Sequence, residues 1–270
     1  MTADFRVRVA TPDDHPAFAR LFLELGVPDP TPTRGDFTNV MLPRILVLDE
    51  GGEVPGYVYW QVYGPTAHVT HLVIDPRHRG RGAGRALMDA VRARVVGEGC
   101  ARWYLHVKRD NAAAIRLYER CGLRITIETW SLSLAWTRLG ALARPAAALT
   151  TFAPTPDDDA AIAAGFDLDV ERLARLRSWP GRILVALREG EAIAAFSAFD
   201  PAASSAHSLC VARRELLRPL LEALRAHARP DGPETLKFPV DGDRALVDTL
   251  VAAGAEIVLE ILRMQGDLRG

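Results

Sequence analysis

The stretch Val73–Val91, VIDPRHRGRGAGRALMDAV, carries the densest local pattern in this 270-residue chain. It begins at the end of an apolar run and holds three glycines and four arginines between Arg77 and Arg85. Leu87, Val91 and Val95 then recur every four residues, which predicts one face of a helix. A glycine-rich turn before a helix offers unpaired backbone N–H groups and the positive end of the helix dipole. We therefore interpret the stretch as a strand, a loop that binds a phosphate or pyrophosphate, and a helix.

Two common phosphate-binding motifs do not fit this loop. A P-loop ends in Gly-Lys-Ser/Thr, and the dinucleotide fingerprint needs G-x-G-x-x-G, whereas this chain has G-x-G-x-G. An RNA-binding loop would interleave aromatic residues with the arginines, and here none do so. The remaining structural alternative is a tight turn whose arginines face solvent.

Composition sets the broad class of the protein. With 49% apolar and 25% charged residues, the chain is typical of a globular protein, and a net charge of -1 disfavours a nucleic-acid binder. The start MTADFRVRVA does not resemble a signal peptide, and no run approaches the ~18 apolar residues of a membrane helix. Cys100, Cys121 and Cys210 are too far apart for a disulfide framework or a zinc motif. We expect a cytoplasmic protein with no metal, nucleic-acid or membrane partner.

Segments of the first half recur in the second half in the same order, which indicates an internal repeat. The four pairs are ATPDDHPAFARLF from Ala10 with PTPDDDAAIAAGF from Pro154, RILVLDEGGEVPGYVYW from Arg44 with RILVALREGEAIAAFSAF from Arg182, AHVTHLVID from Ala67 with AHSLCVA from Ala206, and RLYERCGLRITIETWSLSL from Arg116 with DTLVAAGAEIVLEILRMQ from Asp248.

The repeat predicts two similar α/β units, each a mixed and mostly antiparallel sheet flanked by helices. We expect a first domain over residues 1–137, a linker over 138–149 and a second domain over 150–270. The glycine loop distinguishes the two halves, because the path from Val211 to Leu220 is shorter and contains no glycine. We therefore expect the function in the first half.

Two blocks of the first half resemble the GNAT superfamily of N-acetyltransferases. The family has Arg/Gln-x-x-Gly-x-Gly/Ala after its fourth strand, which here is Arg79–Gly84. Its second block, Asn-x-x-Ala, then a tyrosine seven residues after the asparagine and then Gly-Phe, is matched within LHVKRDNAAAIRLYERCGL, with leucine in place of phenylalanine. The blocks span about residues 68–123, and weaker resemblance extends from Arg6 to Trp136.

The resemblance implies acetyl-CoA as cosubstrate. It implies that the loop wraps the coenzyme pyrophosphate and that the preceding strand pairs with pantetheine through its backbone, whose N–H groups would polarise the thioester carbonyl. Asn111 would bind the coenzyme or order the turn between strand and helix. The implied coenzyme-binding residues are Leu72, Val73, Ile74, Arg79, Gly80, Arg81, Gly82, Ala83, Gly84, Arg85 and Asn111.

Acetyl transfer to an amine needs an acid for the leaving thiolate and a base for the amine. The resemblance places Tyr118 at the coenzyme sulfur as the acid, and packing against the sheet is its structural alternative. Two histidines are candidates for the base. His106 stands where one branch of the family has a glutamate. Other branches have a glutamate at the position of Thr70, and His71 is its neighbour. Imidazole suits proton removal near neutral pH. Each histidine could instead have a structural role. If a chain of water molecules removed the amine proton, neither histidine would be needed as the base.

Aligning Gly254 with Gly122 puts Asp243 at Asn111 and Leu250 at Tyr118, so the second half is expected to be a degenerate copy without catalysis. The sequence thus predicts an acetyl-CoA-dependent N-acetyltransferase that transfers acetyl directly to a primary amine. The acceptor is unidentified. Residues 22–43, the surroundings of Tyr63 and the region near Glu128 and Trp130 are expected to line its cleft. The alternative is a non-catalytic, coenzyme A-binding regulatory module.

Overall fold

The computed structural model describes residues 5–26, 30–168 and 170–269. Within these ranges the chain forms two compact units, one of residues 1–127 and 262–270, the other of residues 128–261. The first boundary falls inside a strand at residue 127, not at residue 137. Residues 136–142, which overlap the start of the expected linker, pack into the second unit, where Trp136, Leu139 and Leu142 are buried.

The first unit is a mixed sheet with strand order β1-β2-β3-β4-β5-β12. Its elements are β1 (Arg6–Val9), α1 (His15–Phe22), α2 (Arg34–Asp36), β2 (Ile45–Asp49), β3 (Gly56–Tyr63), β4 (Thr66–Ile74), α3 (Ala83–Gly97), β5 (Arg102–Lys108), α4 (Ala112–Arg120), the start of β6 (Arg124–Ala135) and the end of β12 (Glu256–Asp267).

The second unit repeats this order of elements. It holds β7 (Thr150–Phe152), α5 (Asp159–Phe166), α6 (Val170–Ser178), β8 (Ile183–Glu189), β9 (Ala192–Asp200), β10 (Ser205–Val211), α7 (Leu217–Arg225), β11 (Thr235–Asp241) and α8 (Arg244–Ala252), with most of β6 and the start of β12. Its strands follow the order β6-β11-β10-β9-β8-β7. The predicted tandem α/β fold is therefore confirmed.

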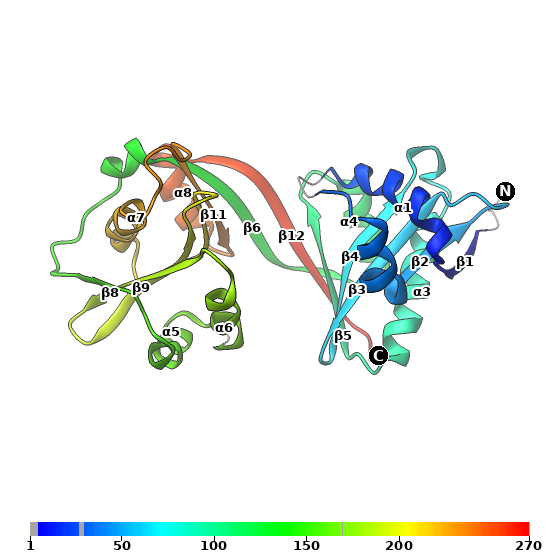
Figure 1. The fold of residues 1–270 in the computed structure, drawn as a ribbon, viewed down its shortest axis with the longest axis horizontal. Helices are drawn as coiled ribbons and strands as arrows, with labels where there is room; N and C mark the ends of the chain where they lie inside the picture. The colour runs from blue at the N-terminus through cyan, green and yellow to red at the C-terminus, as the bar shows by residue number, and fades with distance from the viewer. Residues whose placement is uncertain (1–4, 27–29, 169, 270) are drawn as a thin grey trace. The chain divides into compact units, whose positions relative to one another are not determined.

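Helices cover both faces of the first sheet (Figure 1). On one face, α3 and α4 pack on alternate residues of β4 and β5 through Leu87, Val91 and Leu105. On the other face, α1 packs on β2, β3 and β4 through Phe18 and Tyr57. Apolar residues recur at the helical period in the helices and at every second position in the strands. Their side chains pack between the layers on both faces of the sheet and hold the layers together.

The C-terminal end of β12 completes the first unit. It lies beside β5, where the red end of the chain is seen in Figure 1. Leu262, Met264 and Leu268 are buried in the same core as α3. Between them, a side chain at Gly266 would collide with Gly122 O, since its Cβ would lie 2.7 Å away. A segment from the far end of the chain is therefore part of the first unit's core.

Candidate active site

β4 and β5 run parallel but pair over only part of their length. Pairing extends from Thr66 with Arg102 to Val69 with Leu105 and ends there. β4 continues to Ile74 and β5 to Lys108, so their last residues separate. Parting parallel strands leave unpaired backbone groups on facing edges, and such an edge can accept an extended ligand as an added strand. Leu72, Val73 and Ile74 lie on this part of β4.

A β-bulge sits in β4 at the same point. Tyr59 pairs with His71 and Trp60 with Val69, so Thr70 is the extra residue. Val69 lies in the α3 core before the bulge, and Leu72 packs against the same core after it. The bulge therefore shifts the alternation of side chains between the two faces of the sheet and places His71 on the face that α1 covers.

The glycine loop joins β4 to α3 as the sequence predicts. Gly80 and Gly82 have φ of 75° and 88°, a region that favours glycine, and a Cβ on either would meet nothing within 4 Å. Gly82 caps α3, and the first backbone bond of the helix runs from Ala86 N to Gly82 O, 3.0 Å. The N–H groups of Ala83, Gly84 and Arg85 have no acceptor among the described residues. The loop thus presents an open helix N-terminus suited to an anion.

Gly84 also has a packing role, which the sequence did not predict. It does not have a positive φ, and a Cβ there would lie 2.8 Å from Leu117 Cδ2 on α4. Glycine at this position therefore allows α3 and α4 to approach closely.

The loop arginines contact groups of the protein itself. Arg79 donates to Ile74 O at 2.9 Å and to Glu24 at 3.1 Å. Arg81 lies 2.9 Å from Glu50, and Arg85 lies 2.8 Å from Asp89. All three side chains are exposed, so such ion pairs are weak and an anionic ligand can compete for the guanidinium groups.

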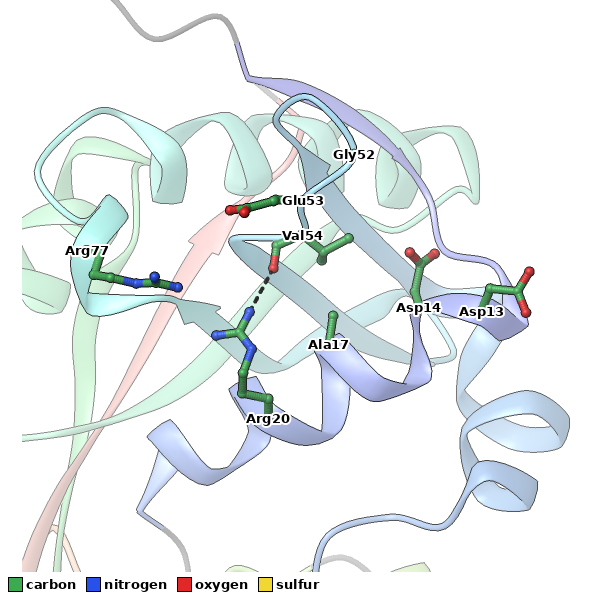
Figure 2. Close-up of a pocket in the computed structure, with 8 residues that line it drawn as sticks. All are labelled: Asp13, Asp14, Ala17, Arg20, Gly52, Glu53, Val54 and Arg77. Carbon is green, nitrogen blue, oxygen red and sulfur yellow. Dashed lines mark hydrogen bonds between the residues drawn. The ribbon is translucent and has the colours of Figure 1, made fainter.

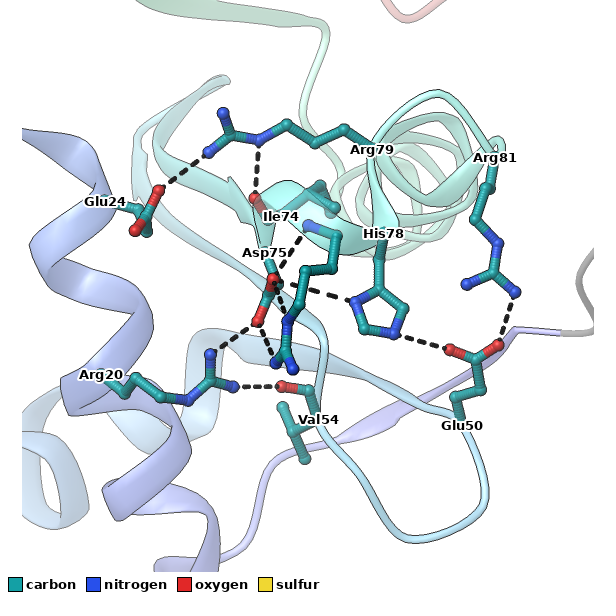
Figure 3. A network of polar contacts seen from close by, with 10 residues as sticks. Arg20, Glu24, Glu50, Val54, Ile74, Asp75, His78, Arg79 and Arg81 are labelled. Atoms are coloured by element: carbon teal, nitrogen blue, oxygen red, sulfur yellow. Dashed lines mark hydrogen bonds and ion pairs between the residues drawn. The ribbon is translucent and has the colours of Figure 1, made fainter.

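Beneath the loop, Asp75 is the centre of a polar network (Figure 3). Its carboxylate accepts from Arg77 N at 3.0 Å, from the Arg77 side chain at 2.9 Å and from Arg20 of α1 at 2.7 Å. The Arg77 guanidinium, above all, holds the pKa of Asp75 well below its usual range. His78 bridges toward the same group, with Nε2 3.2 Å from Glu50 and Nδ1 4.0 Å from Asp75. Only 4% of Asp75 is exposed, so the carboxylate fixes the base of the loop.

Sequence reasoning missed Asp75 and Arg20. Asp75 follows a strand and precedes Pro76, a pattern typical of a residue that caps a short helical turn, and its side chain does cap Pro76–His78. Nothing in the sequence marks Arg20, because only the fold brings α1 to this loop.

Tyr118 lies on α4 with its side chain in the α3 core. It is 7% exposed, and its phenol makes no hydrogen bond to the described residues. Burial raises the pKa of Tyr118 above its ordinary value. The phenol therefore keeps its proton at neutral pH.

The two candidate bases lie on the opposite face of the sheet from the α3 core. His71 is partly buried, with Nδ1 3.3 Å from Tyr57 Oη and its ring against Phe22 and Tyr59. His106 is exposed on β5, edge-on to His68, with ring centroids 5.4 Å apart. The structure thus brings both histidines to one face of the parting strands.

Asn111 caps α4, because its side chain accepts from Ala114 N at 3.1 Å. Asp243 caps α8 in the same way and accepts from Leu246 N at 2.9 Å. The equivalence predicted between the halves therefore holds at this position, and it places Leu250, which is buried, where the first unit has Tyr118. The turn between β10 and α7, residues 212–216, contains no glycine.

A pocket of about 370 Å³ lies behind the loop base, between α1 and the β2–β3 turn (Figure 2). Asp13, Asp14 and Glu53 line it together with Arg20 and Arg77. None of the predicted catalytic or coenzyme-binding residues lines it. Residues 27–29 of the segment expected to line the acceptor cleft lie outside the described residues.

The fold and the loop together resemble those of GNAT acetyltransferases. Residues 16–123 match the acetyltransferase (GNAT) family, so the predicted resemblance is confirmed. A stretch of 75 residues is 33% identical to an acetyltransferase from Pectobacterium atrosepticum. That match covers 28% of this chain and 53%, about half, of the relative.

Solved structures support the fold over the whole chain. A GCN5-related N-acetyltransferase from Sphaerobacter thermophilus is similar with a TM-score of 0.70 and 19% identity, over 98% of this chain and 96% of that one. A tandem GNAT protein from the clavulanic acid biosynthesis pathway has a TM-score of 0.61 and 20% identity, over 99% of both chains.

Among the described residues, no group of three or more His, Cys, Asp or Glu side chains could hold a metal ion. None of the helices in this part of the chain is long and apolar enough to cross a membrane.

Proposed function

We propose that this protein is an acetyl-CoA-dependent N-acetyltransferase that transfers acetyl directly to a primary amine. The observation that carries the proposal is the early end of β4–β5 pairing beside the open N-terminus of α3. The family match over residues 16–123 supports acetyl transfer as the chemistry.

The described residues fit coenzyme A. Backbone N–H groups of Ala83, Gly84 and Arg85 would hold the pyrophosphate at the positive end of α3. Arg79 and Arg81 would exchange the carboxylates of Glu24 and Glu50 for phosphate oxygens, which bind a guanidinium at least as well. Leu72, Val73 and Ile74 would pair with pantetheine along the free edge of β4.

Acetyl-CoA supplies an activated acetyl thioester at this site. As the C–S bond breaks, Tyr118 would give its phenolic proton to the leaving sulfur, and burial keeps the phenol protonated at neutral pH. Backbone N–H groups of β4 would donate to the carbonyl oxygen. His106 or His71 removes the amine proton as the C–N bond forms, so no covalent intermediate on the protein is needed.

The second unit is proposed to be non-catalytic. Leu250 occupies the place of Tyr118 and has no proton to donate. The turn before α7 lacks glycine, so it offers no wide loop for a pyrophosphate.

Calorimetric titration with acetyl-CoA tests the proposal. We expect about one site per chain and an affinity at least tenfold lower in Gly82→Ala. Gly99→Ala is the matched control, because Gly99 lies at the other end of α3 with φ of 83° and an equally open Cβ position. The two substitutions strain the backbone alike, so the thermal midpoint should fall equally while coenzyme affinity falls only at Gly82.

A wild-type protein that binds no acetyl-CoA would overturn the proposal. If acetyl-CoA binds but no primary amine in a broad panel is acetylated, the protein is instead a non-catalytic coenzyme-binding module.

A further inference from the structure

Three neighbouring strands of the first unit present a row of polar side chains on the face away from the α3 core. On β12, Leu262 and Met264 are buried in that core, so Arg263 points to the opposite face. On β5, Leu105 lies in the same core, and Tyr104 and its alternate neighbour His106 share the face of Arg263. The row consists of His68, Tyr104, His106, Arg263 and Gln265.

Direct contacts hold this row together. The His68 and Tyr104 rings stack in parallel with centroids 4.4 Å apart. The Arg263 guanidinium lies 4.3 Å from the Tyr104 ring centroid, on the ring face, where a cation is attracted. His106 meets both rings edge-on, with centroids 5.4 Å from His68 and 5.7 Å from Tyr104. Arg263 is therefore held in the same cluster of rings as a candidate base.

The hydrogen-bonding capacity of Arg263 is mostly unused. Its Nη2 donates to Gln265 Oε1 at 3.3 Å, a long bond to a neutral group. Its Nε is buried and has no acceptor, and no carboxylate of the described residues forms an ion pair with it. A partly buried guanidinium without an anion is unusual, because most such groups are paired. The loop arginines differ in this respect, since each has a carboxylate partner.

We propose that Arg263 binds a carboxylate group on the amine acceptor, so that the acceptor is an amino-carboxylate. A guanidinium fork matches the two oxygens of one carboxylate. Burial above all lowers the pKa of His68, so that ring adds no positive charge near neutral pH, whereas the Arg263 guanidinium stays charged. A single fork suits a monoanion better than a phosphate, which commonly recruits several cations. The proposal rests on the proposed function, because the bound molecule is taken to be the acceptor.

The test uses matched pairs of probes that differ only in charge. Each pair is a free L-amino acid or dipeptide and its carboxamide, titrated calorimetrically into the full-length protein in the presence of coenzyme A, so that no acetyl transfer occurs. We expect at least one carboxylate to bind ten or more times tighter than its amide. Arg263→Gln should abolish this preference, and Arg263→Lys should reduce it. Arg269→Gln, which removes an exposed arginine six residues away on the same segment, should preserve it.

Several results would overturn the proposal: no carboxylate that binds, equal affinities within every pair, or a preference that persists in Arg263→Gln. If Arg263→Gln does not fold, the wild-type preference and its reduction in Arg263→Lys decide the matter. Acetyl transfer is measured separately on the same probes. Transfer without a carboxylate preference contradicts this inference alone. An Arg263-dependent preference without transfer contradicts the proposed activity and leaves Arg263 as a carboxylate-binding residue whose ligand is not an acceptor.

Discussion

Arg20 Nη1 lies 2.7 Å from Asp75 Oδ2, and this ion pair joins α1 to the base of the glycine loop. The same guanidinium donates to Val54 O at 3.3 Å, so α1, the β2–β3 connection and the end of β4 meet at one side chain. Asp75 in turn orients the first turn of the loop through Arg77 N. The helix that packs over one face of the sheet is thereby coupled to the loop proposed to hold the coenzyme.

Replacing Asp75 should loosen the loop. Asp75→Asn keeps the size of the side chain but removes the charge that holds Arg20 and Arg77. We expect acetyl-CoA affinity to fall about tenfold, which corresponds to about 1.4 kcal/mol. Calorimetry checks this, with Asp13→Asn as control because that side chain is 95% exposed. An unchanged affinity in Asp75→Asn would show that the network does not position the loop.

Removing the Tyr118 hydroxyl should affect turnover and leave binding intact. The phenol makes no hydrogen bond to the described residues, so Tyr118→Phe should fold normally. Loss of a general acid typically costs a factor of at least about 100 in kcat. Steady-state kinetics and calorimetry separate the two effects, and Glu119→Gln, an exposed neighbour, serves as control. A Tyr118→Phe protein with wild-type kcat is incompatible with the acid role.

The base should be identified by the pH dependence of kcat/KM. If His71 or His106 takes the amine proton, its replacement by alanine should lower kcat/KM about 100-fold and remove that histidine's ionisation from the acidic limb of the profile. His227→Gln, a substitution in the second unit, should leave the profile unchanged. Should the double variant keep full activity, neither histidine is the base.

His68 should make stability depend on pH. Burial, followed by the positive charges of His106, Arg263 and His71, lowers the pKa of His68 to about 4. In the unfolded chain the His68 imidazole binds a proton near pH 6.5, whereas in the folded protein it stays neutral until the pH approaches 4. The free energy of unfolding is therefore highest above pH 6.5 and falls as the pH drops toward 4.

Because the ring of His68 is only partly buried, solvent reduces the effect. We expect a loss of about 2–4 °C in thermal midpoint, as for about 1 kcal/mol in a chain of this size. His68→Gln should flatten the dependence of the thermal midpoint on pH between pH 6.5 and 4. Burial also lowers the pKa of His207, so that residue should account for the pH dependence that remains. An identical slope in His68→Gln would contradict the assignment.

The last strand should stabilise the first unit. Met264 is fully buried in the α3 core, so Met264→Ala should cost about 2–5 kcal/mol of unfolding free energy. Val258→Ala, on the same strand but 60% exposed, should cost less than about 0.5 kcal/mol. Denaturant unfolding measures both, and equal losses would argue against the contribution of β12 to this core.

Local chemistry explains which features could be predicted. Glycines at positive φ, the Asn111 cap and the amphipathic period of α3 are set by neighbouring residues, so the loop and its helix were predicted from short patterns. The bulge at Thr70 was not predicted, because it depends on the pairing of β4 with β3. Gly84 was assigned to the loop from its sequence position alone. The close approach of Leu117 on α4, which also favours glycine there, is a contact that only folding creates.

The sequence by itself determined the tandem α/β architecture, the glycine loop and the presence of Leu250 in place of Tyr118. Each of these features depends on the order and type of residues that are close together in the chain. Only the tertiary structure decided that Arg20 reaches Asp75, that His71 and His106 share a face, and that Arg263 joins Tyr104. Those pairs are separated by between 35 and 159 positions in the sequence. Their contacts follow from sheet order and helix packing, which no local pattern encodes.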